Sequence, residues 1–307
     1  MTSVGVVAHA EKRLGGGLSE LRKTLAEYGI SDPPWHEVSK SKHVPDGVEE
    51  LVDQGIDLLF VWGGDGTVQR AIDAVVGKPV TLAILPAGTA NLLATNLGLP
   101  EDLEACVRIG LDGARRGLDV GKVNGEHFGV MAGAGLDAMM IRAVDAGLKD
   151  RVGRIAYVWT GAKNMQLDPV GMTIDVDGAR WFEGEASCVL VGNAGDVFGG
   201  LSVFPEAVLD DGYLDLGVVT ADGAWEWART LGRGVVGDLS ASPFVNTTTG
   251  RSVEVRLASP MPYQLDGGDR KASTKLKVKV KPSAITLCVP EGESSCAPRT
   301  MSRRPGT

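Results

Sequence analysis

Apolar runs of strand length alternate with amphipathic segments over the first part of the chain. In the amphipathic segments, apolar residues recur every three or four positions, the period of a helix. The strand-like runs span residues 4–8, 56–62 and 80–85, and the helical spacing covers 18–28, 44–54, 67–76 and 89–97. Strands that are apolar at nearly every position are typical of a parallel sheet with both faces covered. We therefore predict an α/β domain with a parallel sheet over residues 1–125.

The pattern changes after residue 125, where short strands joined by Gly, Asp or Pro turns become frequent. Such strands are predicted at 127–132, 170–176, 181–191, 213–219, 252–257, 261–265 and 275–280, with helical stretches near 137–168 and 222–235. We predict a mainly antiparallel, sandwich-like β domain over 126–290. The tail at 291–307 has no apolar periodicity and is predicted to be disordered.

The amino-acid composition and net charge exclude some classes of function. Glycine makes up 42 of 307 residues, about twice the usual ~7%, and much of it is clustered. The net charge of −8 argues against a general nucleic-acid binder, which needs a basic surface. The four cysteines form no CxxC pair, which indicates reduced thiols in a cytoplasmic protein. We expect neither a signal peptide nor a membrane-spanning segment.

A glycine loop, Gly63-Gly64-Asp65-Gly66-Thr67, lies between a predicted strand and a predicted helix. Backbone N–H groups at such a junction point outward and favour anions, and glycines let a polyphosphate approach closely. Asp65 would act through Mg²⁺ or orient a hydroxyl, since two anions repel. The loop is not the GxxxxGK[ST] P-loop. The alternative is a tight turn with Thr67 as N-cap, but five such residues after an apolar run favour phosphate binding.

A second glycine pattern, at residues 133–138, fits the dinucleotide motif GxGxx[GA]. It lies late in the chain, where strand signals begin, and no βαβ unit precedes it. We interpret these glycines as close packing at a domain junction.

Five ordered motifs resemble those of the diacylglycerol kinase catalytic family, which includes bacterial lipid kinases and sphingosine kinases. The resemblance covers residue 1 to about residue 290. The motifs are the glycine loop, Pro86-Ala87-Gly88-Thr89-Ala90-Asn91, Asp119-Val120-Gly121, Asp210-Asp211-Gly212-Tyr213 and Leu265-Asp266-Gly267-Gly268. The glycine loop alone is shared with NAD kinases and phosphofructokinases, whereas the ordered set is more specific.

The resemblance implies that ATP lies between the two domains and that Mg²⁺ accompanies it. The implied nucleotide-binding residues are Gly63, Gly64, Asp65, Gly66, Thr67, Gly88, Thr89 and Asn91. Asp119 and Asp211 would belong to a metal and water network, completed by the backbone carbonyls of Val208 and Tyr213.

The chain departs from the family pattern at three places. The Asn-Pro after the first strand is replaced by Ala8-His9-Ala10, and the threonine before the second helix is absent, so Ser39 is assigned its role. The late motif has Gly268 where the family has a Glu associated with proton acceptance. We assign Asp266 as the proton acceptor and Asp269 as the reserve, beside Asp65 in the catalytic set. Without the resemblance, Asp266-Gly267 would be interpreted as a hairpin turn.

Four lysines, at 275, 277, 279 and 281, alternate with apolar residues and therefore share one face of a strand. We interpret this as a solvated edge strand that blocks aggregation, with contact to anionic lipid headgroups as the alternative. His9, His36, His43 and His127 are scattered and are assigned no role.

Together, these features predict an ATP-dependent kinase that transfers the γ-phosphate to a hydroxyl of a lipid such as diacylglycerol. The enzyme would be cytoplasmic and would visit the membrane surface; homodimer formation is left open. One alternative is another GGDGT-loop kinase, acting on NAD or a sugar phosphate, but those lack the late Asp-Gly motifs. A second is a nucleotide-binding regulator that lost catalysis with the late Glu.

Overall fold

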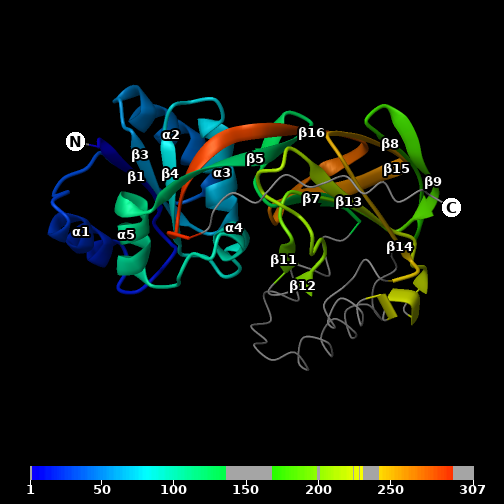
Figure 1. The fold of residues 1–307 in the computed structure, drawn as a ribbon, viewed down its shortest axis with the longest axis horizontal. Helices are drawn as coiled ribbons and strands as arrows, with labels where there is room; N and C mark the ends of the chain where they lie inside the picture. The colour runs from blue at the N-terminus through cyan, green and yellow to red at the C-terminus, as the bar shows by residue number, and fades with distance from the viewer. Residues whose placement is uncertain are drawn as a thin grey trace.

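The computed structural model describes residues 2–135, 168–198, 201–223, 225–227, 229–230 and 242–292 (Figure 1). The predicted helix at 137–168 lies almost wholly outside the described residues. The predicted helix at 222–235 is described in part, with helical residues between 223 and 230. The predicted tail is described only at 291–292.

The N-terminal domain is an α/β unit with parallel strands. Its strands are β1 (Val4–His9), β2 (Trp35–Val38), β3 (Leu58–Gly63) and β4 (Thr81–Pro86). They run in the order β2-β1-β3-β4, and every pair is parallel. The helices are α1 (Leu18–Glu27), α2 (Val44–Asp53), α3 (Asp65–Val75), α4 (Leu92–Asn96) and α5 (Leu103–Asp112), with a 3₁₀ turn at Ser41–His43.

Helices cover both faces of this sheet, as continuous apolar strands require. On one face, Leu21 of α1 and Val107 of α5 pack in a core with Phe60 of β3. On the other, Ile72 of α3 packs with the next strand residue, Val61. All of these side chains are essentially inaccessible to solvent, and each contributes roughly 1.5–3 kcal/mol through burial.

The C-terminal domain is mainly antiparallel, so the predicted fold class is confirmed. Its strands are β5 (Ala114–Val123), β6 (Glu126–Phe128), β7 (Met131–Ala134), β8 (Val170–Val176), β9 (Ala179–Ala186), β10 (Cys188–Gly192), β11 (Asp196–Phe198), β12 (Leu201–Ser202), β13 (Leu214–Val219), β14 (Val245–Gly250), β15 (Ser252–Leu265) and β16 (Gly268–Val289). A second core lies among them, around Phe128, Ile174 and Val255.

Strand β16 connects the two domains (Figure 1). Its first part pairs with β15, its middle and end pair with β5, and Thr286 lies parallel to Thr81 of β4. The edge-strand interpretation of the lysine segment is therefore wrong, because Lys279 has Ser252 on one side and Lys122 on the other. Period two reveals which face of a strand meets solvent, but not whether the strand has neighbours on both sides.

Other differences concern short or polar elements. The predictions at 252–257 and 261–265 form one strand, β15, with an irregular register between Arg256 and Met261. The prediction at 181–191 is two strands, β9 and β10. The sequence patterns do not predict β2, α5, β5, β11, β12 or β14. Of these, β2 is short, and β5 begins with two arginines, Arg115 and Arg116, after Ala114. The apolar length of each described helix falls short of that needed to cross a membrane.

Candidate active site

The glycine loop connects β3 to α3, and Gly63 and Gly64 are its closely packed positions. A Cβ on Gly63 would lie 2.4 Å from the Cβ of Thr67, and Thr67 is 1% exposed. A Cβ on Gly88 would lie 2.4 Å from the Cα of Gly64. The glycine loop and the second motif loop therefore touch backbone to backbone, and a side chain at either position would push them apart.

Asn91 holds the second loop in shape. Its backbone is left-handed, with φ of 48°, which Asn tolerates better than most residues. Its Oδ1 accepts a hydrogen bond from Gly88 N at 2.9 Å, and its Nδ2 donates to the carbonyls of Gly88 and Pro86. Thr89 is left exposed in this loop, and Gly66 is exposed in the glycine loop. Both positions are accessible to a phosphate.

Asp65 ties the two loops together. Its Oδ2 accepts a hydrogen bond from Asn91 N at 3.0 Å, and its Oδ1 accepts one from Leu92 N at 2.5 Å. Burial raises the pKa of the Asp65 carboxyl, although these two N–H donors oppose the rise. Asp65 thus has a structural role in addition to the catalytic one predicted for it.

Ser41, rather than Ser39, lies at the glycine loop. The Oγ of Ser41 is 3.3 Å from the Oγ1 of Thr67. A Cβ on Gly66 would lie 3.7 Å from the same Ser41 Oγ. Ser39 is exposed in the bend after β2. The repeat Ser39-Lys40-Ser41 offers two serines before α2, and the sequence alone does not distinguish them.

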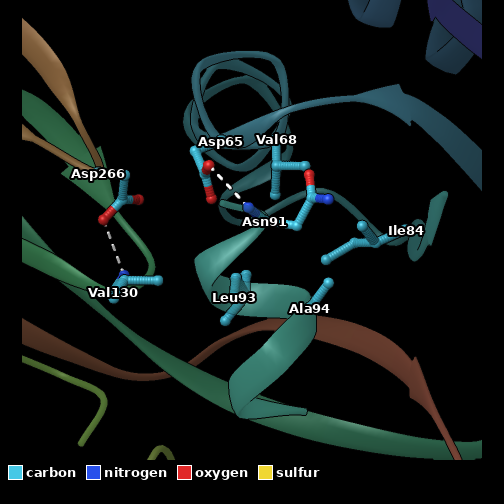
Figure 2. A pocket seen from close by; sticks show the side chains of 8 residues that line it. All are labelled: Asp65, Val68, Ile84, Asn91, Leu93, Ala94, Val130 and Asp266. Carbon is cyan, nitrogen blue, oxygen red and sulfur yellow. Dashed lines mark hydrogen bonds between the residues drawn. The ribbon is translucent and has the colours of Figure 1, made fainter. Parts of the chain in front are cut away.

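Asp65 and Asp266 line one pocket, with Asp65 at the start of α3 and Asp266 in the turn between β15 and β16 (Figure 2). The remaining lining residues are mostly apolar: Val68, Ile84, Asn91, Leu93, Ala94 and Val130. The two predicted catalytic carboxylates, 201 positions apart in the chain, therefore face the same space from different domains. The pocket is small, and its interest lies in the two carboxylates that it brings together against an apolar lining.

The Asp266 carboxylate is 4% exposed and accepts three backbone hydrogen bonds. Oδ2 accepts from Gly129 N at 2.7 Å, and Oδ1 accepts from Val130 N at 2.9 Å and Met131 N at 2.8 Å. Burial raises the pKa of Asp266 to about 6, against the lowering effect of these donors, and nearby Asp65 adds to the rise. A carboxyl with this pKa is ionised at neutral pH and is basic enough to accept a proton.

Asp266 and Gly267 also form the hairpin turn that their sequence alone would indicate. Both residues have positive φ, 44° and 78°, and they join Leu265 to its cross-strand partner Gly268, as in a type I′ hairpin. One residue thus makes the turn and supplies the buried carboxylate. Asp269 is exposed on β16 and does not line the pocket, so the structure places only the first of our two acceptor candidates at the site.

The predicted metal residues come together around Asp119. Its Oδ2 accepts a hydrogen bond from Gly212 N, its Oδ1 accepts from Ser283 N, and its own N–H donates to Leu209 O at 2.8 Å. Val208, Asp211 and Tyr213 belong to the same turn, in which Asp211 Oδ1 accepts from Tyr213 N. Burial raises the pKa of Asp119, and the neighbouring carboxylates of Asp211 and Asp210 raise it further.

Among the described residues, this acidic turn brings the carboxylates of Asp119, Asp210 and Asp211 near one another. Arg116 binds Asp210 Oδ2 at 2.9 Å, while Asp210 Oδ1 is buried and has no hydrogen-bond partner among the described residues. Within those residues, no three acidic, His or Cys side chains converge as direct ligands of one ion. The turn therefore fits a cation held partly through backbone carbonyls and water, and not a site closed by side chains.

Asn193 connects the acidic turn to the pocket, and nothing in the sequence had indicated it. It is 1% exposed, and its Nδ2 donates to Asp119 O at 2.8 Å and to Gly129 O at 3.0 Å. In the second glycine motif, a Cβ on Gly133 would lie 2.5 Å from the Leu190 side chain, so this glycine packs closely, but within the β domain and not at a domain junction. Residues 136–138 of the motif lie outside the described residues.

Comparisons with solved structures show the class of fold. A diacylglycerol kinase from Bacillus anthracis str. Sterne matches with a TM-score of 0.75 at 22% identity, covering 94% of this chain and 97% of that one. An NAD kinase from Archaeoglobus fulgidus, solved in complex with ATP, matches with a TM-score of 0.55 at 10% identity, covering 94% of both chains. Both share the two-domain architecture described above.

Sequence comparisons then give the family. The diacylglycerol kinase catalytic domain model matches residues 11–123, and the model of the YegS C-terminal NAD kinase beta sandwich-like domain matches residues 130–289. The diacylglycerol kinase of Bacillus subtilis (strain 168) is 30% identical over 223 residues, which is 71% of this chain and 73% of that protein. A Pseudomonas fluorescens protein named "Probable lipid kinase YegS-like" is 30% identical over 80% of this chain and 81% of its own length. The chain belongs to the diacylglycerol kinase family of lipid kinases.

Proposed function

We propose that this chain is an ATP-dependent kinase that transfers the γ-phosphate to a hydroxyl of a lipid such as diacylglycerol. The observation that carries the proposal is the pocket shared by Asp65 and Asp266, whose other lining is mostly apolar. The pocket is small, so within the proposal it holds the acceptor's hydroxyl and its immediate neighbours, with the Asp266 carboxylate beside them. The chain's relatives named diacylglycerol kinase support a lipid acceptor.

In the proposed reaction, the lipid hydroxyl oxygen attacks the γ-phosphorus, and the bond from that phosphorus to the ADP oxygen breaks. Asp266 accepts the hydroxyl proton, for which its raised pKa suits it. In the proposal the phosphates lie against the exposed loop positions Gly66 and Thr89, with Ser41 beside Thr67. Asp65 keeps the two loops in contact, so that both loop positions lie near the same ligand.

Mg²⁺ belongs to the proposal because a triphosphate must be partly neutralised before an alcohol attacks it. Asp119 and Asp211, with the carbonyls of Val208 and Tyr213, would hold it. We expect excess chelator to abolish phosphorylation and added Mg²⁺ to restore it. Full activity in chelator would refute this part of the proposal. Asp211→Asn should raise the Mg²⁺ concentration needed for half-maximal rate.

A basic face supports transient contact with an anionic membrane surface. Lys279 lies directly opposite Lys122, and Lys277 and Lys281 flank it on the same face of β16. Like charges opposite one another on a sheet are destabilising, which a purely structural role does not explain. Glu254 offsets part of this charge, since it lies opposite Lys277 on β15 and pairs with Lys275 at 2.9 Å.

The test is transfer of labelled phosphate from ATP to a panel of acceptors. Diacylglycerol, a sphingoid base and a polyprenol in mixed micelles are compared with NAD and a sugar phosphate in solution. We expect label in a lipid and none in the soluble acceptors. Label in NAD or the sugar phosphate would support the alternative kinases. ATP binding with no labelled product would indicate a nucleotide-binding regulator.

A further inference from the structure

Arg270 lies on β16, and all three of its side-chain nitrogens donate hydrogen bonds. Nε donates to both carboxylate oxygens of Glu126 at 2.9 and 3.0 Å, and Nη2 donates to Glu126 Oε2 at 2.8 Å and Gln69 Oε1 at 3.3 Å. Nη1 donates to the carbonyls of Gly268 and Asp269, both at 3.1 Å. The side chain is only 13% exposed. A guanidinium satisfied in this way has a defined position.

The hydrogen-bond partners of Arg270 lie on three elements. These are α3, which carries Asp65, the β15–β16 turn, which carries Asp266, and β6, which precedes the amides that bind Asp266. Gln69 lies one helical turn after Asp65 on α3, is 2% exposed, and donates to His127 O at 2.7 Å. Glu126 begins β6, which leads into the N–H groups of residues 129–131 that hold Asp266. Gly268 closes the turn that contains Asp266 itself. Arg270 contacts every one of these elements.

Arg270 also lies beside Gly268, the position of the missing late glutamate. A Cβ on Gly268 would lie 3.0 Å from Arg270 Nη1, closer than nearly all real contacts, and the backbone of Gly268 is not left-handed. A side chain at position 268 would therefore require the Arg270 guanidinium to shift by a few tenths of an ångström.

We propose that Arg270 is a positioning residue that sets the separation of Asp65 and Asp266 by tying α3, β6 and the β15–β16 turn together. This inference rests on the proposed function, since that separation matters because ATP and the acceptor hydroxyl must meet between the two acids. Displacements of about 1 Å in such a geometry can cost about 10²-fold in rate. Arg270 itself does not line the pocket.

The test uses Arg270→Gln and Arg270→Lys in the full chain. Glu126 keeps a partner in both variants, because Arg70 Nη1 also binds it at 2.8 Å, so no carboxylate is left uncompensated. Arg256→Gln is the matched control: Arg256 also bridges two carboxylates, of Asp175 and Glu254, but on the outer face of the sheet. We expect Arg270→Gln to lower kcat about 10–100-fold with KM for ATP changed less than ~3-fold, and Arg270→Lys to recover part of the loss.

Hydrogen exchange provides a measurement that does not depend on activity. The amides of Gly129, Val130 and Met131 should exchange faster in Arg270→Gln than in wild type, and should be unchanged in Arg256→Gln. Unchanged kcat and exchange in folded Arg270→Gln would overturn the proposal while leaving the lipid kinase activity standing. If these amides exchange faster in Arg270→Gln but even the wild-type protein phosphorylates no lipid, the role of Arg270 is supported and the proposed function is contradicted. If Arg270→Gln does not fold, Arg270→Lys takes its place, and wild-type kcat and exchange in it would overturn the proposal.

Discussion

Replacing Asp266 with asparagine removes the proposed proton acceptor with almost no change in size. Burial raises the pKa of Asp266 to about 6, so the wild-type kcat should be level above about pH 7 and fall tenfold per pH unit below about pH 6. Asparagine cannot accept the proton, so kcat should drop by about 10²–10⁴-fold, and the acid limb assigned to Asp266 should disappear.

The same substitution changes how stability depends on pH. A rise in pKa from 3.8 to about 6 is about two units, which corresponds to about 3 kcal/mol in favour of the protonated form. Because the folded-state pKa is the higher one, this stabilisation is fully present below pH 3.8 and is lost as pH rises through about 6. Relative to Asp266→Asn, wild type should therefore lose about 3 kcal/mol of unfolding free energy between about pH 4 and about pH 8.

The assay measures kcat at saturating ATP and lipid across this pH range for wild type, Asp266→Asn and Asp269→Asn. Asp269 is the matched control, since it is an exposed aspartate three residues along the same hairpin. Urea unfolding at both pH extremes supplies the stability difference. A large kcat loss in Asp269→Asn but not in Asp266→Asn would refute the assignment, as would an acid limb centred near the ordinary pKa of aspartate. If neither variant loses activity, a group other than these carboxylates takes the proton.

Further predictions concern the loops and the basic face. Asp65→Ala should abolish turnover and, by leaving the N–H groups of Asn91 and Leu92 without an acceptor, lower the unfolding free energy by roughly 1–3 kcal/mol; urea titration and kcat check both. Gly88→Ala should weaken ATP binding, measured by calorimetry. Gly184→Ala should not, because a Cβ on Gly184 would lie 3.4 Å from the Phe182 ring, an ordinary contact. A quadruple lysine-to-glutamate variant should co-sediment less with anionic vesicles at low salt, and unchanged sedimentation would contradict the membrane role of Lys275, Lys277, Lys279 and Lys281.

Much of the architecture follows from local patterns. Continuous apolar runs predicted β1, β3 and β4, and the helical period predicted α1, α2 and α3, because strand and helix geometry impose their periods on the sequence wherever a face is buried. The glycine loop was recognisable for a similar reason: only glycine permits the contact between Gly64 and Gly88. Asp266 was found as a candidate through its motif, and its turn through the Asp-Gly pair.

The tertiary structure decided which of these residues work together. Periodicity cannot show that β16 is an interior strand, since the alternation of lysines is the same with one neighbour or two. Nor does local sequence distinguish Ser41 from Ser39, or Asp266 from Asp269, because burial and direction are set by packing. Arg270 and Gln69 are 201 positions apart, yet their side chains form a hydrogen bond. Such contacts exist only once two domains close on each other, and they determine where the pocket carboxylates lie.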